Sequence, residues 1–283
     1  MHDETSAPIP LQDGNPSQII LRKLNKYGRF LLTTIFFAAY ALVMLRLWWP
    51  INLPGKVNGP AAVLLVATLA CTVAALTRHL PLQNVLGAAA VIILGSGMAE
   101  WLNVETGIPF GPINFGAVGP KFHSLPWALP IIWTVAILNS RGVARLILRP
   151  WRKTKNYGVR LISLTIALAV FFDFTFEPYA TRVKHYWFWE PTRFPLTWQG
   201  APLINFLSWA VVALLILAFV TPMLINKQLS KRRPPDLHPL IIWLATILLF
   251  AVGSAIQGMW IVVAVDAAIG IVAATFAIRG AKW

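Results

Sequence analysis

Charged residues are scarce in this chain of 283 residues, because only 12% of its side chains are Asp, Glu, Lys or Arg. Soluble domains contain about 25% of these residues. Hydrophobic residues make up 57% of the sequence, and the mean hydropathy is +0.66. A water-soluble fold could not bury so much apolar surface, which excludes a soluble globular domain.

Cysteine is almost absent as well, since Cys71 is the only one and lies inside an apolar run. A disulfide framework and a cysteine-based metal site are therefore excluded. The sequence also lacks a Walker loop, a dinucleotide-binding fingerprint and an HExxH motif. His123 and His185 have no second ligand at metal spacing. We therefore expect neither a metal ion nor a cofactor.

Apolar runs of about membrane-spanning length occupy most of the sequence. They predict an all-α, polytopic transmembrane bundle of about eight helices, which forms a single domain over residues 30–283. Residues 1–29 are polar and basic, and we expect them to form a disordered tail. The predicted spans are, in chain order, residues 30–49, 60–78, 83–102, 125–140, 161–180, 202–225, 239–256 and 259–278.

The positions of the basic residues predict how the bundle is oriented. The net charge is +14, but Lys and Arg lie in short runs at the ends of the apolar runs, which favours membrane orientation over nucleic-acid binding. With a cytoplasmic N-terminus, 18 of the 24 Lys and Arg residues fall in cytoplasmic segments. We therefore expect a multi-pass protein of the cytoplasmic (inner) membrane, with both termini cytoplasmic, surrounded by membrane lipids and without a nucleic-acid partner.

Two long loops on the outward side differ from ordinary flexible loops. Residues 103–124 and 181–201 contain Gly, Pro and aromatic residues but little flexible polar sequence. Such segments are expected to fold back against the bundle.

Five of the ten acidic residues lie at the outward ends of the predicted helices or in the outer loops: Glu100, Glu105, Asp173, Glu177 and Glu190. An ionisable group at membrane depth is costly, which makes it a candidate for function. Asp173 and Glu177 are spaced i, i+4 and share a helix face, and Glu100 lies at the matching level of another span. We expect these three carboxyls to line one cavity, where a carboxylic acid that holds a proton can serve as general acid.

Structural interpretations of the same residues remain open. A carboxylate at a helix end can reach the lipid headgroups or pair with Arg182 and Lys184, which would account for Glu177 without catalysis. Asp266, inside the last predicted span, could form a hydrogen bond between helices or take part in catalysis. Half or more of the outward aromatic residues fit an interfacial belt, while the rest could line a lipid cavity and stabilise a carbocation.

Three stretches together resemble a known family. Residues 100–119 (EWLNVETGIPFGPINFGAVG) are similar to a Glu followed by a Thr-Gly-x-Pro-Phe-Gly block, and residues 173–189 (DFTFEPYATRVKHYWFW) to an Asp-x-x-x-Asp-Pro segment that ends in Trp-x-Trp. Residues 200–209 (GAPLINFLSW) match a Gly-x-Pro-x-x-Asn-Phe-x-x-Trp signature. In order and spacing, they resemble the carotenoid biosynthesis membrane proteins typified by carotenoid 1',2'-hydratase and bisanhydrobacterioruberin hydratase. Glu177 stands where the family pattern has Asp.

The resemblance implies a hydratase (hydro-lyase) of carotenoid biosynthesis that needs no cofactor. Its substrate would be a long polyene, an isoprenoid lipid, and water would add to the terminal 1',2' double bond of an acyclic end group. Other enzymes of the carotenoid pathway are candidate partners. The alternatives are a small-molecule or proton-coupled transporter, for which we find no internal repeat, and another carotenoid- or lipid-modifying enzyme.

The hydratase mechanism predicts a role for each motif residue. Asp173 or Glu177 would donate the proton, with Glu100 as the partner or the base that orients water, although these roles could be exchanged. Gly107, Gly111 and Gly200 would permit close backbone approach. The predicted substrate-binding residues are Phe110, Gly111, Trp187, Trp189, Asn205 and Trp209.

Overall fold

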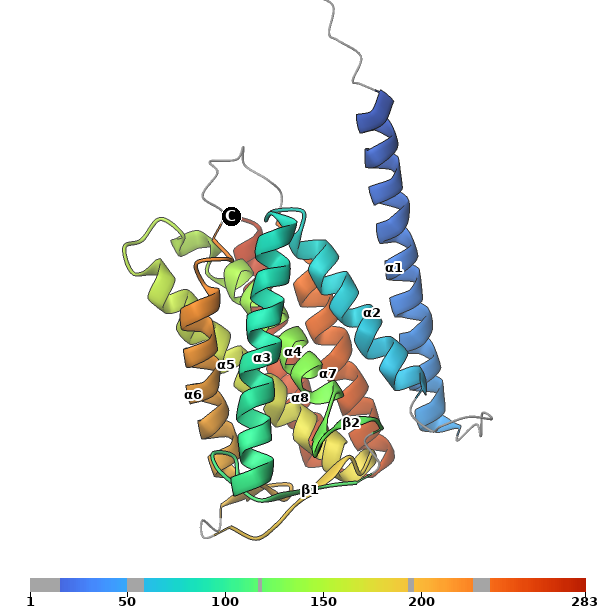
Figure 1. Cartoon of the computed structure of the whole chain (residues 1–283), viewed down its shortest axis with the longest axis vertical. Coiled ribbons are helices and arrows are strands. Elements are labelled where there is room, and N and C mark those ends of the chain that lie inside the picture. Colours follow the sequence, from blue (N-terminus) through green and yellow to red (C-terminus); the bar gives the residue numbers. More distant parts are fainter. Residues whose placement is uncertain (1–15, 50–58, 117–118, 193–195, 226–234) are drawn as a thin grey trace, which may run out of the picture.

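A bundle of eight α-helices makes up most of the computed structural model, which describes residues 16–49, 59–116, 119–192, 196–225 and 235–283 (Figure 1). The predicted all-α bundle is therefore confirmed. The helices are α1 (Pro16–Trp48), α2 (Gly59–Leu76), α3 (Leu82–Thr106), α4 (Ala128–Ile147), α5 (Tyr157–Pro178), α6 (Leu203–Val220), α7 (His238–Ile256) and α8 (Trp260–Ala281).

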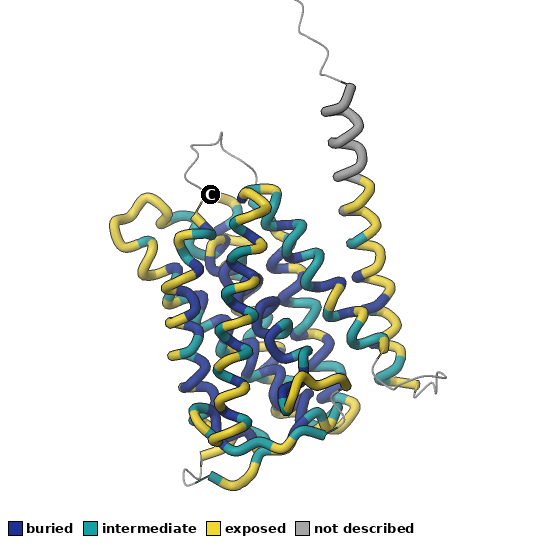
Figure 2. Tube along the Cα trace, in the orientation of Figure 1, coloured by how far each residue is buried: buried dark blue, intermediate teal, exposed yellow. Residues whose placement is uncertain are grey.

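Seven of these helices are long and apolar enough to cross a membrane, and α4 is the exception. Helix α4 lies at the centre of the bundle, where it packs against α2, α3, α5, α7 and α8. Figure 2 shows buried residues concentrated in the interior of the bundle. Because protein surrounds α4, it can contain buried Asn139, Ser140 and Arg141, and the Asn139 amide donates to the Thr72 hydroxyl at 2.9 Å. The chain is a multi-pass membrane protein.

The largest differences from the predicted helix boundaries are at three places. Helix α1 begins at Pro16 rather than at residue 30, so the basic part of the predicted disordered tail is helical, and residues 1–15 lie outside the described residues. Helix α4 runs over residues 128–147 rather than 125–140, because it continues past its basic residues inside the protein. Helix α6 ends at Val220, before the predicted end at residue 225.

Short antiparallel strand pairs cover one end of the bundle, which we call the strand end. The strands are β1 (Ile113–Phe115), β2 (Lys121–Phe122), β3 (Leu125–Pro126), β4 (Trp187–Trp189), β5 (Thr197–Trp198) and β6 (Ala201–Pro202). Strand β1 pairs with β4, β2 with β3 and β5 with β6. The β1–β4 pair joins the two long loops, and Phe110 in the first loop and Trp187 in β4 are buried. The expectation that these loops fold back against the bundle is confirmed.

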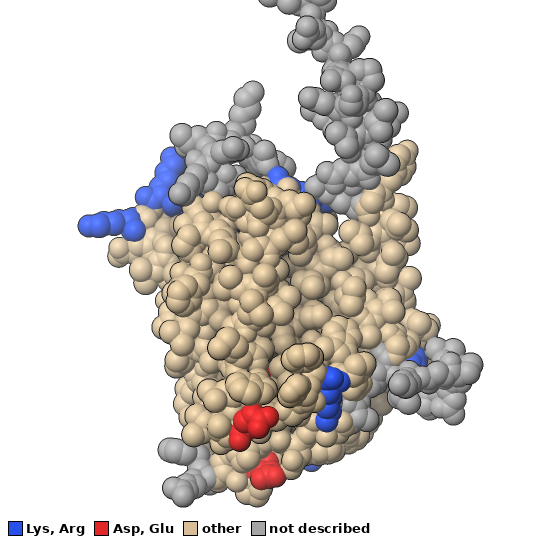
Figure 3. Space-filling model, in the orientation of Figure 1, with Lys and Arg blue, Asp and Glu red and all other residues tan. Residues whose placement is uncertain are grey.

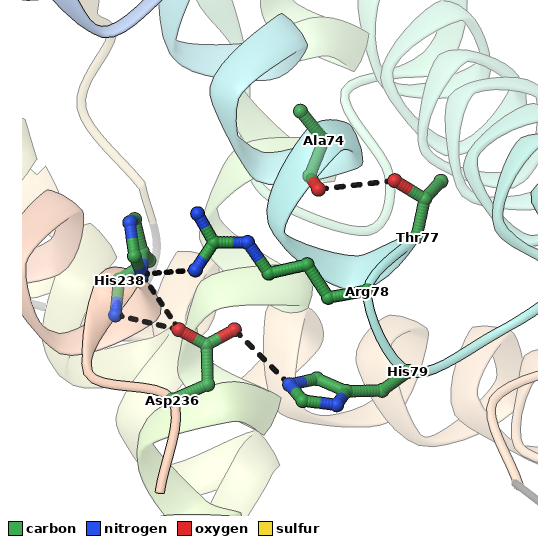
Figure 4. Close-up of polar contacts among 6 residues, drawn as sticks. All are labelled: Ala74, Thr77, Arg78, His79, Asp236 and His238. Carbon is green, nitrogen blue, oxygen red and sulfur yellow. Dashed lines mark hydrogen bonds and ion pairs between the residues drawn. The ribbon is translucent and has the colours of Figure 1, made fainter. Parts of the chain in front are cut away.

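The opposite end of the bundle holds a polar cluster between α2 and α7 (Figure 4). The Asp236 Oδ1 atom accepts from the backbone N–H of His238 at 3.1 Å and lies 2.7 Å from its Nδ1 atom, while Oδ2 lies 3.5 Å from His79 Nε2. Arg78 completes the cluster, with its guanidinium 3.3 Å from His238 Nδ1. The cluster fixes the start of α7 to the turn that follows α2.

Charges differ between the two ends of the bundle. On the face shown in Figure 3, Lys and Arg side chains gather at the opposite end, whereas acidic side chains and a smaller basic group lie toward the strand end. The C-terminus and the start of α1 lie at the opposite end too (Figure 1). The cytoplasmic location of both termini, and the identity of the membrane, stay predictions.

Candidate functional site

The three predicted carboxyls line one small cavity near the strand end, which we call the carboxyl cavity. Helix α3 contributes Glu100, and α5 contributes Asp173 and Glu177, each at most 6% exposed. The volume is about 20 Å³, which is enough for about one water molecule. The full lining consists of Glu100, Ile113, Leu129, Trp133, Asp173, Phe176, Glu177, Trp187, Trp189, Asn205 and Trp209.

Glu177 is held by three neutral donors. The indole N–H groups of Trp187 and Trp189, on β4, donate to Oε2 at 3.2 and 2.9 Å. The Asn205 amide, on α6, donates to Oε1 at 3.4 Å. Both carboxyl oxygens are therefore occupied, and the interpretation that Glu177 pairs with Arg182 or Lys184 is wrong.

Asp173 and Glu100 each accept a single hydrogen bond from the described residues. The same Asn205 amide donates to Asp173 Oδ2 at 2.9 Å, so Asn205 joins Asp173 to Glu177. The Trp133 indole donates to Glu100 Oε1 at 3.3 Å. No hydrogen bond from the described residues occupies Asp173 Oδ1 or Glu100 Oε2, and no described ion pair involves these carboxyls. Each of the two groups thus keeps one oxygen for a proton or a water molecule.

Stacked aromatic rings form one wall of the cavity. Trp209 stacks on Trp133 on one side and on Phe110 on the other, with a centroid separation of 4.5 Å from Phe110. Four of the predicted substrate-binding residues, Trp187, Trp189, Asn205 and Trp209, line the cavity. Phe110 and Gly111 do not line it, because Phe110 stacks on Trp209 and Gly111 lies beside Pro202 and Trp189.

Asn103 supports this wall, and sequence reasoning missed it. Its side chain is 1% exposed, and Oδ1 accepts from the backbone N–H groups of Phe110 and Gly111 at 2.8 and 3.2 Å. Its amide donates to the Gly111 carbonyl at 2.9 Å. Asn103 follows Glu100 by one helical turn, so the i, i+3 spacing was a usable signal. Trp133 was also missed, and only the packing of α4 reveals it.

Proline in the Glu-Pro motif attaches a loop to the end of α5. Pro178 has no N–H, so the Phe174 carbonyl has no partner within the helix. The Trp198 indole, on β5, donates to this carbonyl at 2.9 Å, and its ring stacks on Phe174. After Pro178, the chain continues as a π-helical turn over Tyr179–Val183 and enters β4. The motif therefore leads the chain from the catalytic candidates of α5 to the tryptophans of β4.

The remaining acidic candidates lie away from the carboxyl cavity. Glu105 and Glu190 are exposed, and they accept hydrogen bonds from Ser124 at 3.1 Å and from Asn114 at 2.7 Å. Asp266 is fully buried in α8, but neither of its oxygens has a hydrogen-bond partner among the described residues. The interhelical hydrogen bond proposed for Asp266 is therefore wrong for the described part of the chain.

Two of the three glycines singled out act through backbone conformation rather than close approach. Gly107 has a φ of 71° and ends α3 in the left-handed conformation, and Gly200 has a φ of 99° in the β5–β6 turn. Gly111 has a φ of 113° and also permits close approach, because an added Cβ would lie 3.3 Å from the Pro202 side chain. The expectation thus holds for Gly111 only.

Metal binding has no arranged donor set in the described residues. Among them, no group of three or more His, Cys, Asp or Glu side chains is placed to hold a metal ion. The chemistry that the carboxyl cavity can support is proton transfer among its three carboxyls, beside aromatic rings.

Comparison with known proteins identifies a family. A family model described as "Carotenoid biosynthesis protein" matches residues 59–273, which covers helices α2 to α7 and most of α8. The match includes every residue that lines the carboxyl cavity. Comparisons with curated proteins and with solved structures gave no significant match.

Proposed function

Because this chain belongs to the carotenoid biosynthesis protein family, we propose that it is a hydratase which adds water to the terminal double bond of an acyclic carotenoid. The observation that carries the proposal is the convergence of Glu100, Asp173 and Glu177 on a cavity with room for about one water molecule. Acid-catalysed hydration needs a proton donor, a base and one water. The cavity can supply all three without a redox cofactor.

The first step is proton transfer from Asp173 to the less substituted carbon of the terminal double bond. Asp173 suits the donor role because its Oδ1 atom carries no hydrogen bond from the described residues, while Asn205 holds Oδ2 at 2.9 Å. The π electrons form the new C–H bond, which leaves a tertiary carbocation on the neighbouring carbon. Both oxygens of Glu177 are occupied, so we assign it electrostatic stabilisation of the cation rather than proton transfer.

The second step is the attack of water on the cation. Glu100 is the base, because Trp133 holds Oε1 at 3.3 Å and leaves Oε2 for the water proton. The water oxygen forms a bond to the tertiary carbon, and its proton passes to Glu100. Transfer of a proton from Glu100 back to Asp173 restores the starting state, so the net reaction is the addition of one water. The rings of Trp133, Trp187 and Trp209 stabilise the cation through cation–π attraction.

The family match supports an enzyme over the alternative of a transporter. Isotope labelling tests the hydratase directly. Membranes that contain the protein receive an acyclic carotenoid in oxygen-labelled water, or separately in deuterium oxide, and the products are analysed by mass spectrometry. Membranes from the same host without the protein are the control.

A hydratase gives a product heavier by one water, with the labelled oxygen in a tertiary hydroxyl. In deuterium oxide, one non-exchangeable deuterium appears on the adjacent carbon, and the reaction proceeds without molecular oxygen. A product whose oxygen comes from molecular oxygen, or the absence of any product from several acyclic carotenoids, would overturn the proposal.

A further inference from the structure

A second, larger cavity lies beside the carboxyl cavity, and we call it the apolar cavity. Its volume is about 160 Å³, and it lies between α1, α2, α4, α5 and α7. Helix α1 contributes Phe36, Tyr40 and Val43, and α2 contributes residues that include Ala61 and Thr68. The residues that carry the carboxyls do not line it.

Three of the hydroxyl groups that line the apolar cavity already have partners. The Tyr40 hydroxyl donates to the Ala245 carbonyl at 2.8 Å, and Thr68 and Thr246 donate to carbonyls of their own helices at 2.6 and 2.8 Å. Burial raises the pKa of Tyr186, in the loop after α5, to about 12, so this phenol stays neutral. A cavity lined in this way has no charged group for a polar ligand, and it suits a hydrocarbon.

Three residues separate the two cavities. Leu129, Phe176 and Trp187 line both of them. Phe176 contacts Trp187 edge to face at a centroid distance of 5.5 Å. The indole N–H of the same Trp187 donates to Glu177 in the carboxyl cavity. A chain in the apolar cavity therefore ends one side-chain layer from the carboxyls.

The extent of the apolar cavity favours an elongated ligand. On α2 the lining runs from Ala61 to Thr68, which corresponds to about 10 Å along the helix, or about a third of the hydrocarbon core of a bilayer. Helix α1 forms one wall and stands at the edge of the bundle, where it packs mainly against α2 (Figure 1). Helix α1 is therefore the wall of the cavity that lies at the edge of the bundle.

From this arrangement we infer that the apolar cavity binds the hydrocarbon chain of a long polyene substrate, and that Leu129, Phe176 and Trp187 form the partition across which its end group reaches the carboxyls. The inference rests on the proposed function for the identity of the end group and of the reaction. The binding of the chain itself follows from the shape and chemistry of the cavity.

Substitution on α2 tests the inference. Ala61→Trp fills the apolar cavity, whereas Val63→Trp places the same side chain on the exposed side of the helix, where Val63 is 51% exposed. Retention of an acyclic carotenoid is measured from its absorbance per purified protein, with and without the additional change Asp173→Asn. We expect Ala61→Trp to lower retention about tenfold, because it displaces two or more buried methylene-sized groups of the ligand. Val63→Trp should retain the wild-type amount.

Ala61→Leu is a smaller change that serves as a second variant in case Ala61→Trp misfolds. Elution as a single species in detergent establishes that each variant is folded. Ala61→Leu should give an intermediate loss. Wild-type retention in both folded Ala61 variants would overturn the inference, even if hydration continues. Loss of retention in Ala61→Trp, combined with no hydration by the wild type, would uphold the binding site and overturn the proposed function instead.

Discussion

Carboxylates at the two ends of this bundle are held by different kinds of partner. At the opposite end, Asp236 lies against His79 and His238, with Arg78 beside them, so its neighbours can carry positive charge. In the carboxyl cavity, indole and amide N–H groups are the partners of Glu100, Asp173 and Glu177. Neutral donors orient a carboxyl without neutralising it. The first arrangement fixes two helices, whereas the second leaves carboxyls able to exchange protons.

The largest effect should come from removing the proposed acid. Asp173→Asn keeps the size of the side chain but cannot deliver the proton, and we expect hydration to fall about 100- to 10,000-fold. The matched change Asp236→Asn at the opposite end should leave the rate near that of the wild type. Initial rates of product formation in membranes with equal amounts of protein give the comparison. A rate above about a tenth of the wild-type value in Asp173→Asn would assign the proton to another group.

A smaller loss should follow from removing one neutral donor. Trp189→Phe deletes the 2.9 Å hydrogen bond to Glu177 but retains an aromatic ring. A hydrogen bond to a charged group contributes about 1.5–3 kcal/mol, so we expect the rate to fall by about tenfold or more. Trp101→Phe is the control, since Trp101 is exposed on α3. Equal rates in the two variants would show that the indole donors of β4 do not act in catalysis.

Asp236→Ala should change stability rather than rate. The substitution removes the acceptor of the His238 backbone N–H and the partner of His79, which should cost about 1 kcal/mol or slightly more. Thermal unfolding in detergent should occur at a lower temperature, while the rate below that temperature stays unchanged. A large loss of hydration in protein that is still folded would contradict the structural role of this cluster.

Asp266→Asn should have the smallest effect. Asp266 lines neither cavity, and its oxygens accept no hydrogen bond from the described residues, so the amide removes no contact. We expect an unchanged rate and a change in stability below about 0.5 kcal/mol. Hydration kinetics and thermal unfolding check both. A loss of rate as large as that of Asp173→Asn would place Asp266 in the path of the proton.

Much of the fold follows from the sequence, because long apolar runs have few alternatives to membrane helices. The limits of α4 were harder to predict. Asn139, Ser140 and Arg141 resemble the polar end of a span, but contacts with five other helices allow α4 to continue through them. The strands were not predictable, since β1 and β4 have three residues each and pair across more than one helix.

The candidate site was predictable to the extent that local spacing determines it. The i, i+4 relation of Asp173 and Glu177 placed them on one face, and the level of Glu100 matched theirs. Trp133 could not be found in this way, because its contact with Glu100 depends on how α4 packs against α3. Asn205 was predicted as a substrate-binding residue, and in the structure its amide contacts two carboxyls.

Pro178 has a further consequence for how reactants travel. If β5 moved away from α5, the Phe174 carbonyl would lose its Trp198 donor in apolar surroundings. The free-energy cost of this loss is about 1–3 kcal/mol. This cost disfavours an opening to water at the strand end of the bundle. The hydrophobic substrate and its alcohol product would instead enter and leave laterally, through the lipid bilayer.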